Sequence, residues 1–318
     1  MQRAFVFPGQ GSQAVGMGRG LAEAFPAARL VFEEVDDALD QHLSRLMFEG
    51  PEDELTLTEN AQPALMTVSM AVVRVLEEEG GFKLPELSRC VAGHSLGEYS
   101  ALAAARSLEL ADAARLLKRR GQAMQTAVPL GEGAMAALLG LNLAKALEVA
   151  EAATETPEGK REVCAAANDN APGQVVVSGH AGAVERAARL AAEQGARRAV
   201  MLPVSAPFHC SLMAPAAEAM ESALANIALA PPLVPLIANV TAEPVLEPSK
   251  IRSLLVEQVT AMVRWRESVQ KMREEGVEQL VELGSGRVLS GLTRRIDKEL
   301  SSVALNEPGD IDSFLTSL

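Results

Sequence analysis

The sequence has few of the residues that build metal centres and disulfide frameworks. Its 318 residues include three cysteines and four histidines. Cys90, Cys164 and Cys210 lie far apart and have no CxxC spacing, so we expect neither a structural zinc site nor a disulfide framework. With so few histidines, we expect no metal cluster of another kind.

Long apolar runs and net positive charge are also lacking. No apolar stretch approaches the roughly 18 residues that span a bilayer, and residues 1–8 are too short and too soon broken by Pro8 to be a signal peptide. The formal net charge of -13 would repel the phosphates of nucleic acid. The sequence therefore predicts a cytoplasmic protein that binds neither membrane nor nucleic acid. Small anionic substrates are not excluded, because one well-placed arginine can dominate a pocket.

Aromatic residues make up only 3% of the chain, whereas hydrophobic residues of all kinds make up 48%. The core must therefore be built from Ala, Leu, Val and Met. The length is about twice that of one ordinary domain, which indicates one large domain with an insertion, or two domains.

Short apolar segments alternate with helical patterns, which favours an α/β fold with a mainly parallel sheet. The expected strands include residues 4–7, 90–92, 234–238 and 279–283. The expected helices include residues 64–79, 98–105, 212–228, 251–275 and 288–299, and residues 21–46 also show helical spacing. Residues 134–204 differ, because they have the order β-α-β-β-α-β around a polar turn at 168–173. That order is the ferredoxin-like pattern, and we interpret it as a small inserted domain.

Residues 93–97 read Gly-His-Ser-Leu-Gly between an expected strand and an expected helix. This is the sequence form of a nucleophile elbow, where a tight turn lifts the serine oxygen clear of the sheet and only glycine tolerates the crowding on either side. The free N–H groups of the following helix can stabilise an oxyanion. We therefore predict that Ser95 carries an acyl group as an ester. The alternative is an ordinary turn between a strand and a helix.

A serine nucleophile needs a base, and His209 is the candidate. It follows a strand and precedes a helix, where α/β sheets place catalytic groups. The side chain of His94 is expected to leave the elbow on the other side, while His42 and His180 are expected at the surface. No acid that follows an obvious core strand lies between Ser95 and His209. A Ser–His dyad oriented by an amide or a carbonyl group therefore fits at least as well as a triad.

Residues 9–14 read Gly-Gln-Gly-Ser-Gln-Ala after the first strand, which matches a loose Rossmann pattern. The acidic residue that should follow a second strand about 20 residues later is missing, because that region has a helical pattern. We favour a close backbone approach to the rim that carries Ser95. The N–H group of Gln10 could then supply a second oxyanion donor.

Three motifs occur together along the chain: Phe-Pro-Gly-Gln-Gly-Ser-Gln at 7–13, Gly-His-Ser-Leu-Gly-Glu-Tyr at 93–99, and Pro-Phe-His at 207–209. In their order and spacing the whole chain resembles the malonyl-CoA:acyl-carrier-protein transacylases. The resemblance implies an α/β-hydrolase-like core at residues 1–129 and 203–318, and a ferredoxin-like subdomain inserted at 130–202. The chain departs from the family pattern at Cys210, Ser285 and residues 261–262, where serine, proline and a proline-containing turn are usual.

The resemblance also implies roles for the reacting groups. Ser95 would be acylated, and His209 would act as general base and then as general acid. The backbone N–H groups of Gln10 and Leu96 would form the oxyanion hole. The main-chain carbonyl of Gln258 would orient the histidine, which agrees with the missing acid.

Other matched positions would bind the substrate. Arg120 would pair with the free carboxylate of malonyl, because its planar fork can hold a carboxylate with two hydrogen bonds. Without the resemblance, residues 118–120 would be interpreted as a solvated helix face. Phe208 fits a malonyl-selective pocket with little room for a methyl branch, and Asn168 and Asn170 match a loop that faces the cleft.

The implied reaction is a ping-pong transfer of malonyl from malonyl-CoA to the phosphopantetheine thiol of acyl carrier protein, by a monomer with no permanently bound cofactor. An acidic carrier requires a local basic patch, for which the candidates are Arg119, Arg287, Arg294 and Arg295. One rival function is an esterase or thioesterase of α/β-hydrolase type, which predicts a buried acid on the histidine. Another is a nucleotide-binding oxidoreductase that uses the glycine-rich turn at residues 9–14.

Overall fold

Two sheets organise the computed structural model, which describes residues 1–204 and 206–318. The larger sheet contains β1 (Arg3–Phe7), β2 (Ser88–Gly93), β7 (Leu236–Ile237), β8 (Pro244–Val245), β9 (Gln279–Leu283) and β10 (Ser301–Leu305). Its order is β10-β9-β1-β2-β7-β8, and every neighbouring pair is parallel except β7 and β8. The central strands β1 and β2 are short and largely buried, as in a parallel sheet with both faces covered. The predicted α/β fold with a mainly parallel sheet is confirmed.

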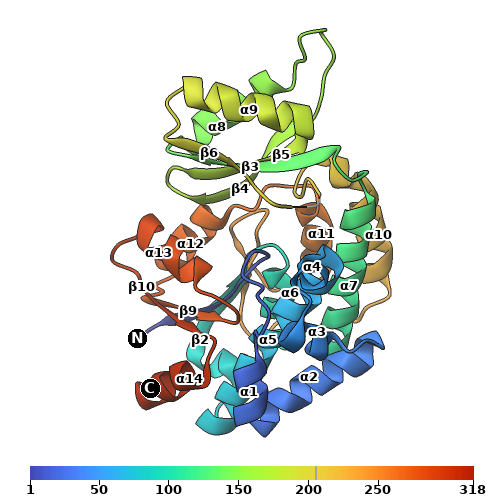
Figure 1. Cartoon of the computed structure of the whole chain (residues 1–318). Coiled ribbons are helices and arrows are strands. Elements are labelled where there is room, and N and C mark those ends of the chain that lie inside the picture. The colour runs from blue at the N-terminus through green and yellow to red at the C-terminus, as the bar shows by residue number, and fades with distance from the viewer. Residues whose placement is uncertain (205) are drawn as a thin grey trace.

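The smaller sheet is antiparallel and has the order β4-β5-β3-β6. Its elements are β3 (Gly133–Leu139), α8 (Leu143–Ala153), β4 (Cys164–Ala171), β5 (Gln174–His180), α9 (Ala181–Glu193) and β6 (Arg198–Met201). Buried alanines and valines of the two helices and the sheet form a separate apolar core. Figure 1 shows both helices on the face of this sheet that points away from the larger body. The predicted β-α-β-β-α-β order of this segment is confirmed.

Helices cover the larger sheet. They are α1 (Arg19–Ala24), α2 (Pro26–Leu39), α3 (Leu43–Glu49), α4 (Glu52–Thr56), α5 (Thr58–Gly80), α6 (Gly97–Ala104), α7 (Leu110–Thr126), α10 (Ala214–Ala225), α11 (Pro248–Gln258), α12 (Trp265–Glu274), α13 (Val288–Ile296) and α14 (Pro308–Thr316), with 3-10 turns at Leu84–Leu87 and Ser211–Met213. Along nearly all of its length α5 is buried, and α6, made largely of small residues, is buried throughout. Small side chains let these helices pack closely in a core with few aromatic rings. Within the described residues, no helix combines the length and apolar character needed to cross a bilayer.

Several expected elements differ from the structure. The helical pattern of residues 21–46 is divided among α1, α2 and α3, because the chain breaks before Pro26 and again at Asp40, which has a φ of 48°. The expected helix 251–275 is two helices, α11 and α12. Between them the N–H of Val263 donates to the carbonyl of Ala167, and Val263 in turn accepts from Asp169. This pairing holds the linker extended beside β4, so it cannot be helical.

The expected turn at residues 168–173 is also shorter than predicted. Asn168, Asp169 and Asn170 belong to β4, which runs to Ala171 before the chain turns. Their polar side chains are placed where the smaller sheet faces the larger body, because the linker at Val263 pairs with this end of the strand. The last strand and helix, β10 and α14, were not predicted.

Candidate active site

Ser95 lies in the turn between β2 and α6, with a φ of 53° in the left-handed region. Glycine is required on both sides. A Cβ added to Gly93 would lie 1.8 Å from the carbonyl carbon of Gly97, and one added to Gly97 would lie 2.3 Å from the carbonyl oxygen of Phe7. The spacing Gly-x-Ser-x-Gly therefore has a steric cause: the turn brings the start of α6 against both β1 and β2.

Two side chains hold the backbone of Ser95 in this strained conformation. The Ser95 N–H donates to Oδ1 of Asn239 at 2.7 Å, and the Ser95 carbonyl accepts from Nε2 of Gln258 at 2.9 Å. Asn239 also donates from Nδ2 to the carbonyl of Gly93 at 2.6 Å. The sequence analysis did not select Asn239 as a site residue. The signal that could have found it is a polar residue two positions after a short buried strand, β7.

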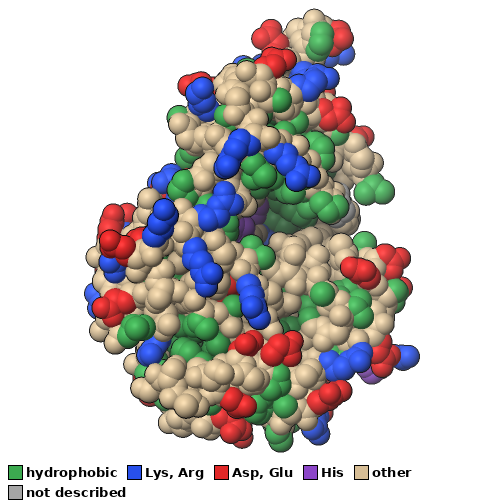
Figure 2. Space-filling model, turned by 60° about the vertical axis from the view of Figure 1, so that its left-hand side comes forward, with side chains coloured by type: hydrophobic (Ala, Val, Ile, Leu, Met, Phe, Trp, Pro, Cys, Tyr) green, Lys and Arg blue, Asp and Glu red, His purple; other side chains and the backbone are tan. Residues whose placement is uncertain are grey.

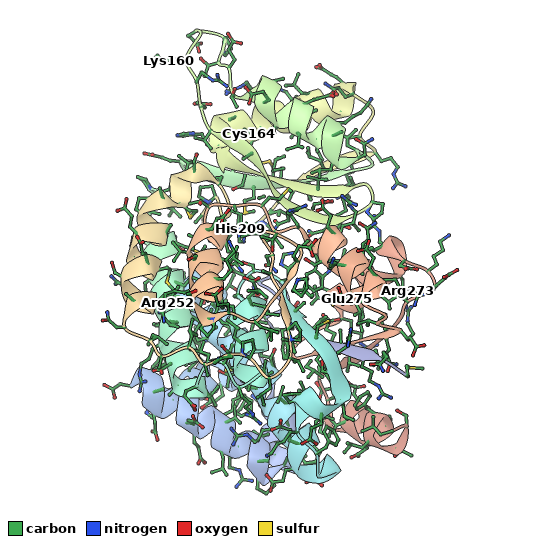
Figure 3. The ribbon with its side chains drawn as sticks, turned by 180° about the vertical axis from the view of Figure 1, so that it is seen from behind. Lys160, Cys164, His209, Arg252, Arg273 and Glu275 are labelled. Atoms are coloured by element: carbon green, nitrogen blue, oxygen red, sulfur yellow. The ribbon has the colours of Figure 1, made fainter. Side chains whose placement is uncertain are left out.

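His209 is in contact with Ser95. Its Nε2 lies 2.8 Å from Oγ of Ser95, and its Nδ1 lies 2.8 Å from the carbonyl oxygen of Gln258. A carbonyl only accepts, so Nδ1 carries the proton and Nε2 is free to accept the serine hydroxyl, as a general base must. Gln258 is the last residue of α11, where backbone carbonyls have no partner within the helix. Figure 3 shows His209 between the smaller sheet and the larger body.

Burial and, secondarily, the positive charge of Arg120 lower the pKa of His209 to about 3. The imidazole is therefore neutral in the folded protein at neutral pH. This is the form that accepts a proton from a serine hydroxyl.

The contribution of this buried neutral histidine to stability should become unfavourable in mild acid, which a variant without it reveals. Below the ordinary histidine pKa of 6.5 the unfolded chain binds a proton that the folded chain does not bind until about pH 3, so the free energy of unfolding falls as the pH falls. By linkage, the lowered pKa of His209 alone reduces the free energy of unfolding by about 1.4 kcal/mol at about pH 5.5. Burial also lowers the pKa of His94, which acts in the same direction, whereas burial raises the pKa of Glu98 to about 8, which acts in the opposite direction.

Urea unfolding at about pH 7.5 and about pH 5.5 measures the effect, with His209→Asn as the comparison. The variant should lose less stability between the two pH values than the wild type. Equal losses would contradict a neutral His209.

Arg120 reaches the same serine from α7. Arg120 is 1% exposed, and its guanidinium donates to Oε1 of Gln62 at 2.7 Å, to Oε1 of Gln258 at 2.9 Å and to Oγ of Ser95 at 3.1 Å. Its Nε has no partner among the described residues. Burial lowers the pKa of Arg120, because the charge has been taken out of water. A buried cation with a free N–H beside Ser95 is suited to a substrate anion.

The glycine-rich turn lies against the elbow. A Cβ added to Gly9 would lie 2.8 Å from the carbonyl oxygen of His94. In the part of the chain that the structure describes, the N–H groups of Gln10 and Leu96 have no acceptor. Both residues line the cavity that contains Ser95, so both N–H groups are available to a substrate oxygen.

A cavity of about 420 Å³ contains most of the predicted site residues. Polar groups form one side of it, and an apolar wall is formed by Met124, Met135, Leu202, Val204 and Phe208. The predicted residues in its lining are Gln10, Ser95, Leu96, Arg120, Asn168, Phe208 and His209. In Figure 2 a hollow between the two parts of the molecule exposes a histidine. A cavity with one polar side and one apolar wall suits a small acyl group with one charged end.

Two predicted site residues lie behind this lining. Gln258 is fully buried behind His209 and Arg120. Oδ1 of Asn170 accepts from Nε2 of His94 at 2.8 Å, and the His94 ring packs beside that of Trp265. His42 is exposed at the start of α3, and His180 accepts from the N–H of Val163. Among the described residues, no group of three or more His, Cys, Asp or Glu is placed to hold a metal ion.

Comparisons with known proteins agree on one family. A family model described as an acyl transferase domain matches residues 4–303. The malonyl CoA-acyl carrier protein transacylase of Escherichia coli (strain K12) is 48% identical over 314 residues, 99% of each chain. The protein of the same name from Bacillus subtilis (strain 168) is 46% identical over 315 residues, 99% of this chain and 96% of the relative.

Solved structures extend the likeness to the whole fold. An acyl-carrier-protein-S-malonyltransferase from Bartonella henselae has a TM-score of 0.95 and 55% identity, and the match covers 100% of this chain and 99% of that one. A malonyl-transacylase in complex with a type II PKS acyl-carrier protein has a TM-score of 0.95 and 42% identity, with 100% of both chains covered.

Proposed function

The chain belongs to the malonyl-CoA:acyl-carrier-protein transacylases of the acyl transferase domain family, and we propose that it passes malonyl between two thiols through an ester on Ser95. The observation that carries the proposal is the contact of Oγ of Ser95 with both Nε2 of His209 and the guanidinium of Arg120. One partner accepts the serine proton, and the other is a cation that a free carboxylate can reach. An acyl group with such a carboxylate is malonyl.

In the first half-reaction malonyl-CoA binds with its carboxylate on Arg120. Ser95 attacks the thioester carbon as Nε2 of His209 takes its proton, and the N–H groups of Gln10 and Leu96 stabilise the oxyanion. The carbon–sulfur bond then breaks, and CoA leaves as a thiol with the proton from His209. The carbonyl of Gln258 stabilises the imidazolium formed between these two proton transfers.

In the second half-reaction the phosphopantetheine thiol of the carrier protein attacks the malonyl ester. His209 now takes the thiol proton and returns it to Oγ of Ser95 as the ester bond breaks. Water must be kept from the ester for the malonyl group to reach the thiol. The apolar wall that includes Met124, Met135 and Phe208 supports this, because it offers water few hydrogen-bond partners.

The two rival functions fit the site less well. An α/β-hydrolase triad requires an acid on Nδ1 of His209, where a main-chain carbonyl lies instead. A dinucleotide site requires space at the glycine-rich turn, whose Gly9 is packed against His94.

We also assign residues 1–129 and 203–318 to an α/β-hydrolase-like core and residues 130–202 to a ferredoxin-like subdomain. The parallel sheet with its nucleophile elbow supports the first assignment, and the order β4-β5-β3-β6 supports the second. We also propose that the protein is a cytoplasmic monomer with no permanently bound cofactor.

The carrier protein is proposed to bind beside the cavity at α13. Arg287 lies two residues after Ser285, whose hydroxyl donates to the carbonyl of Ser12, and the neighbours Gly11 and Gln13 line the cavity. Arg294 and Arg295 are exposed in the last turn of the same helix. Figure 2 shows Lys and Arg side chains in a band beside the hollow, which would attract an acidic carrier. Arg119 lies elsewhere, in a groove between α7 and α10.

The test of the function compares transfer with hydrolysis. Given malonyl-CoA and a phosphopantetheine-bearing carrier protein, the enzyme should form malonyl-carrier at least roughly tenfold faster than free malonate, because the site excludes water. Mass spectrometry of the carrier and quantification of malonate give the two rates. Release of malonate at an equal or greater rate would identify a thioesterase instead.

A further inference from the structure

We propose that Glu98 is a positioning residue for the transfer reaction: its carboxylate fixes the orientation of the Gln258 side-chain amide and, through it, the position of the Arg120 guanidinium. The inference rests on the proposed function, because its readout is the preference for malonyl over acetyl. Glu98 lies only three residues after Ser95, yet it takes no direct part in the proposed acyl and proton transfers.

Glu98 is 1% exposed in the first turn of α6. Its Oε1 accepts from the backbone N–H of Asn239 at 2.5 Å, and its Oε2 accepts from Nε2 of Gln258. Both oxygens therefore face donors, which is the arrangement of an ionised carboxylate. Burial raises the pKa of Glu98 to about 8, while its two hydrogen bonds and the charge of Arg120 oppose that rise. The N-terminal end of α6 also favours a negative charge here.

The carboxylate decides which way the Gln258 amide points. Because Nε2 of Gln258 donates to Glu98 and to the carbonyl of Ser95 at 2.9 Å, its Oε1 must point to Arg120, from which it accepts at 2.9 Å. If a donor replaced the carboxylate of Glu98, the Gln258 amide would favour the opposite orientation, in which Nε2 and Oε1 exchange places. Reversal would place an NH₂ group against the guanidinium and an oxygen against the carbonyl of Ser95, and both contacts are repulsive.

Arg120 depends on its acceptor, Oε1 of Gln258, more than an exposed arginine would, because no water can replace that oxygen. The guanidinium is buried, and Gln62, Gln258 and Ser95 are its hydrogen-bond acceptors among the described residues. Loss of one acceptor leaves a buried charge with a missing partner, which shifts the group that would bind the malonyl carboxylate. Acetyl has no carboxylate, so its transfer should be affected less.

Glu98→Gln tests the proposal, because it keeps the shape of the side chain and replaces one acceptor with a donor. The ratio of kcat/KM for malonyl-CoA to that for acetyl-CoA should fall at least about tenfold, measured above pH 8, where the wild-type carboxyl is ionised. The matched control is Glu282→Gln. Glu282 is also a buried carboxylate, but it accepts from the N–H groups of Leu289 and Ser290 at the start of α13. That variant should keep the ratio within about twofold.

Gln258→Met provides a second test if Glu98→Gln does not fold. It keeps the main-chain carbonyl that faces His209 and removes the amide, so the ratio should fall by a similar factor. If Glu98→Gln folds, the double variant with Gln258→Met should have the same malonyl-to-acetyl ratio as Gln258→Met alone. A folded Glu98→Gln or Gln258→Met protein with the wild-type ratio would overturn the proposal. Failure of the proposed function would appear instead in the wild type, as no preference for malonyl.

Discussion

Replacing Ser95 with alanine should abolish malonyl transfer, lowering kcat by about 10⁴-fold or more, the range found when a catalytic nucleophile is removed. The reason is specific to the site. His209 and Arg120 both contact Oγ of Ser95, so without this oxygen neither the base nor the cation has a group to activate. The rate is measured as malonyl-carrier formed from malonyl-CoA, at equal concentrations of folded protein.

Ser100→Ala is the matched control for this experiment. Ser100 lies on α6, is fully buried, and its hydroxyl has no hydrogen-bond partner among the described residues. This variant should retain activity within about threefold, since its hydroxyl stabilises nothing in the site. Transfer by Ser95→Ala at a rate near that of the wild type would place the nucleophile elsewhere.

Replacing Arg120 with alanine should lower kcat/KM for malonyl-CoA by about 100-fold or more, because a buried charge pair is lost. The loss with acetyl-CoA should be much smaller, since acetyl carries no carboxylate. Arg120→Lys should recover little of the malonyl activity, because an ammonium group cannot reproduce the fork that reaches Gln62, Gln258 and Ser95. Steady-state kinetics with the two acyl-CoAs give both values.

Arg119→Ala separates this effect from a general loss of positive charge on α7. Arg119 is exposed and faces the groove that contains Pro215 and Ala219, away from the cavity. Its replacement should leave the malonyl-to-acetyl ratio unchanged. Equal losses with malonyl-CoA and acetyl-CoA in Arg120→Ala would remove the carboxylate role from Arg120.

Local constraints explain why the sequence alone selects Ser95 and His209 as the proposed reacting groups. The elbow around Ser95 must have glycine on both sides, because any Cβ there would meet backbone. His209 follows the smaller sheet in the chain, at a position typical of catalytic groups in α/β proteins. Arg120 depended on the resemblance to a family, because residues 118–120 alone have the pattern of a solvated helix face.

The residues that support the reacting groups could not be predicted from local pattern, because long-range contacts place them; the role of Gln258 was expected only from the resemblance to a family. Gln258 is free to orient His209 only because α11 ends there, and α11 ends because Val263 pairs with β4. This chain has no proline within residues 251–275 to mark that break, although the family usually has a proline-containing turn at residues 261–262. Asn239 and Glu98 meet Ser95 and Gln258 only after β7 has paired with β2, so their roles depend on the assembled sheet.

The most direct test is the mass of the intact wild-type protein after a short incubation with malonyl-CoA and no acceptor thiol, followed by peptide mapping. We expect the addition of one malonyl group, on the peptide that contains Ser95, and its removal when a phosphopantetheine thiol is added. An adduct on another residue, or continued transfer with no adduct on Ser95, would contradict this expectation.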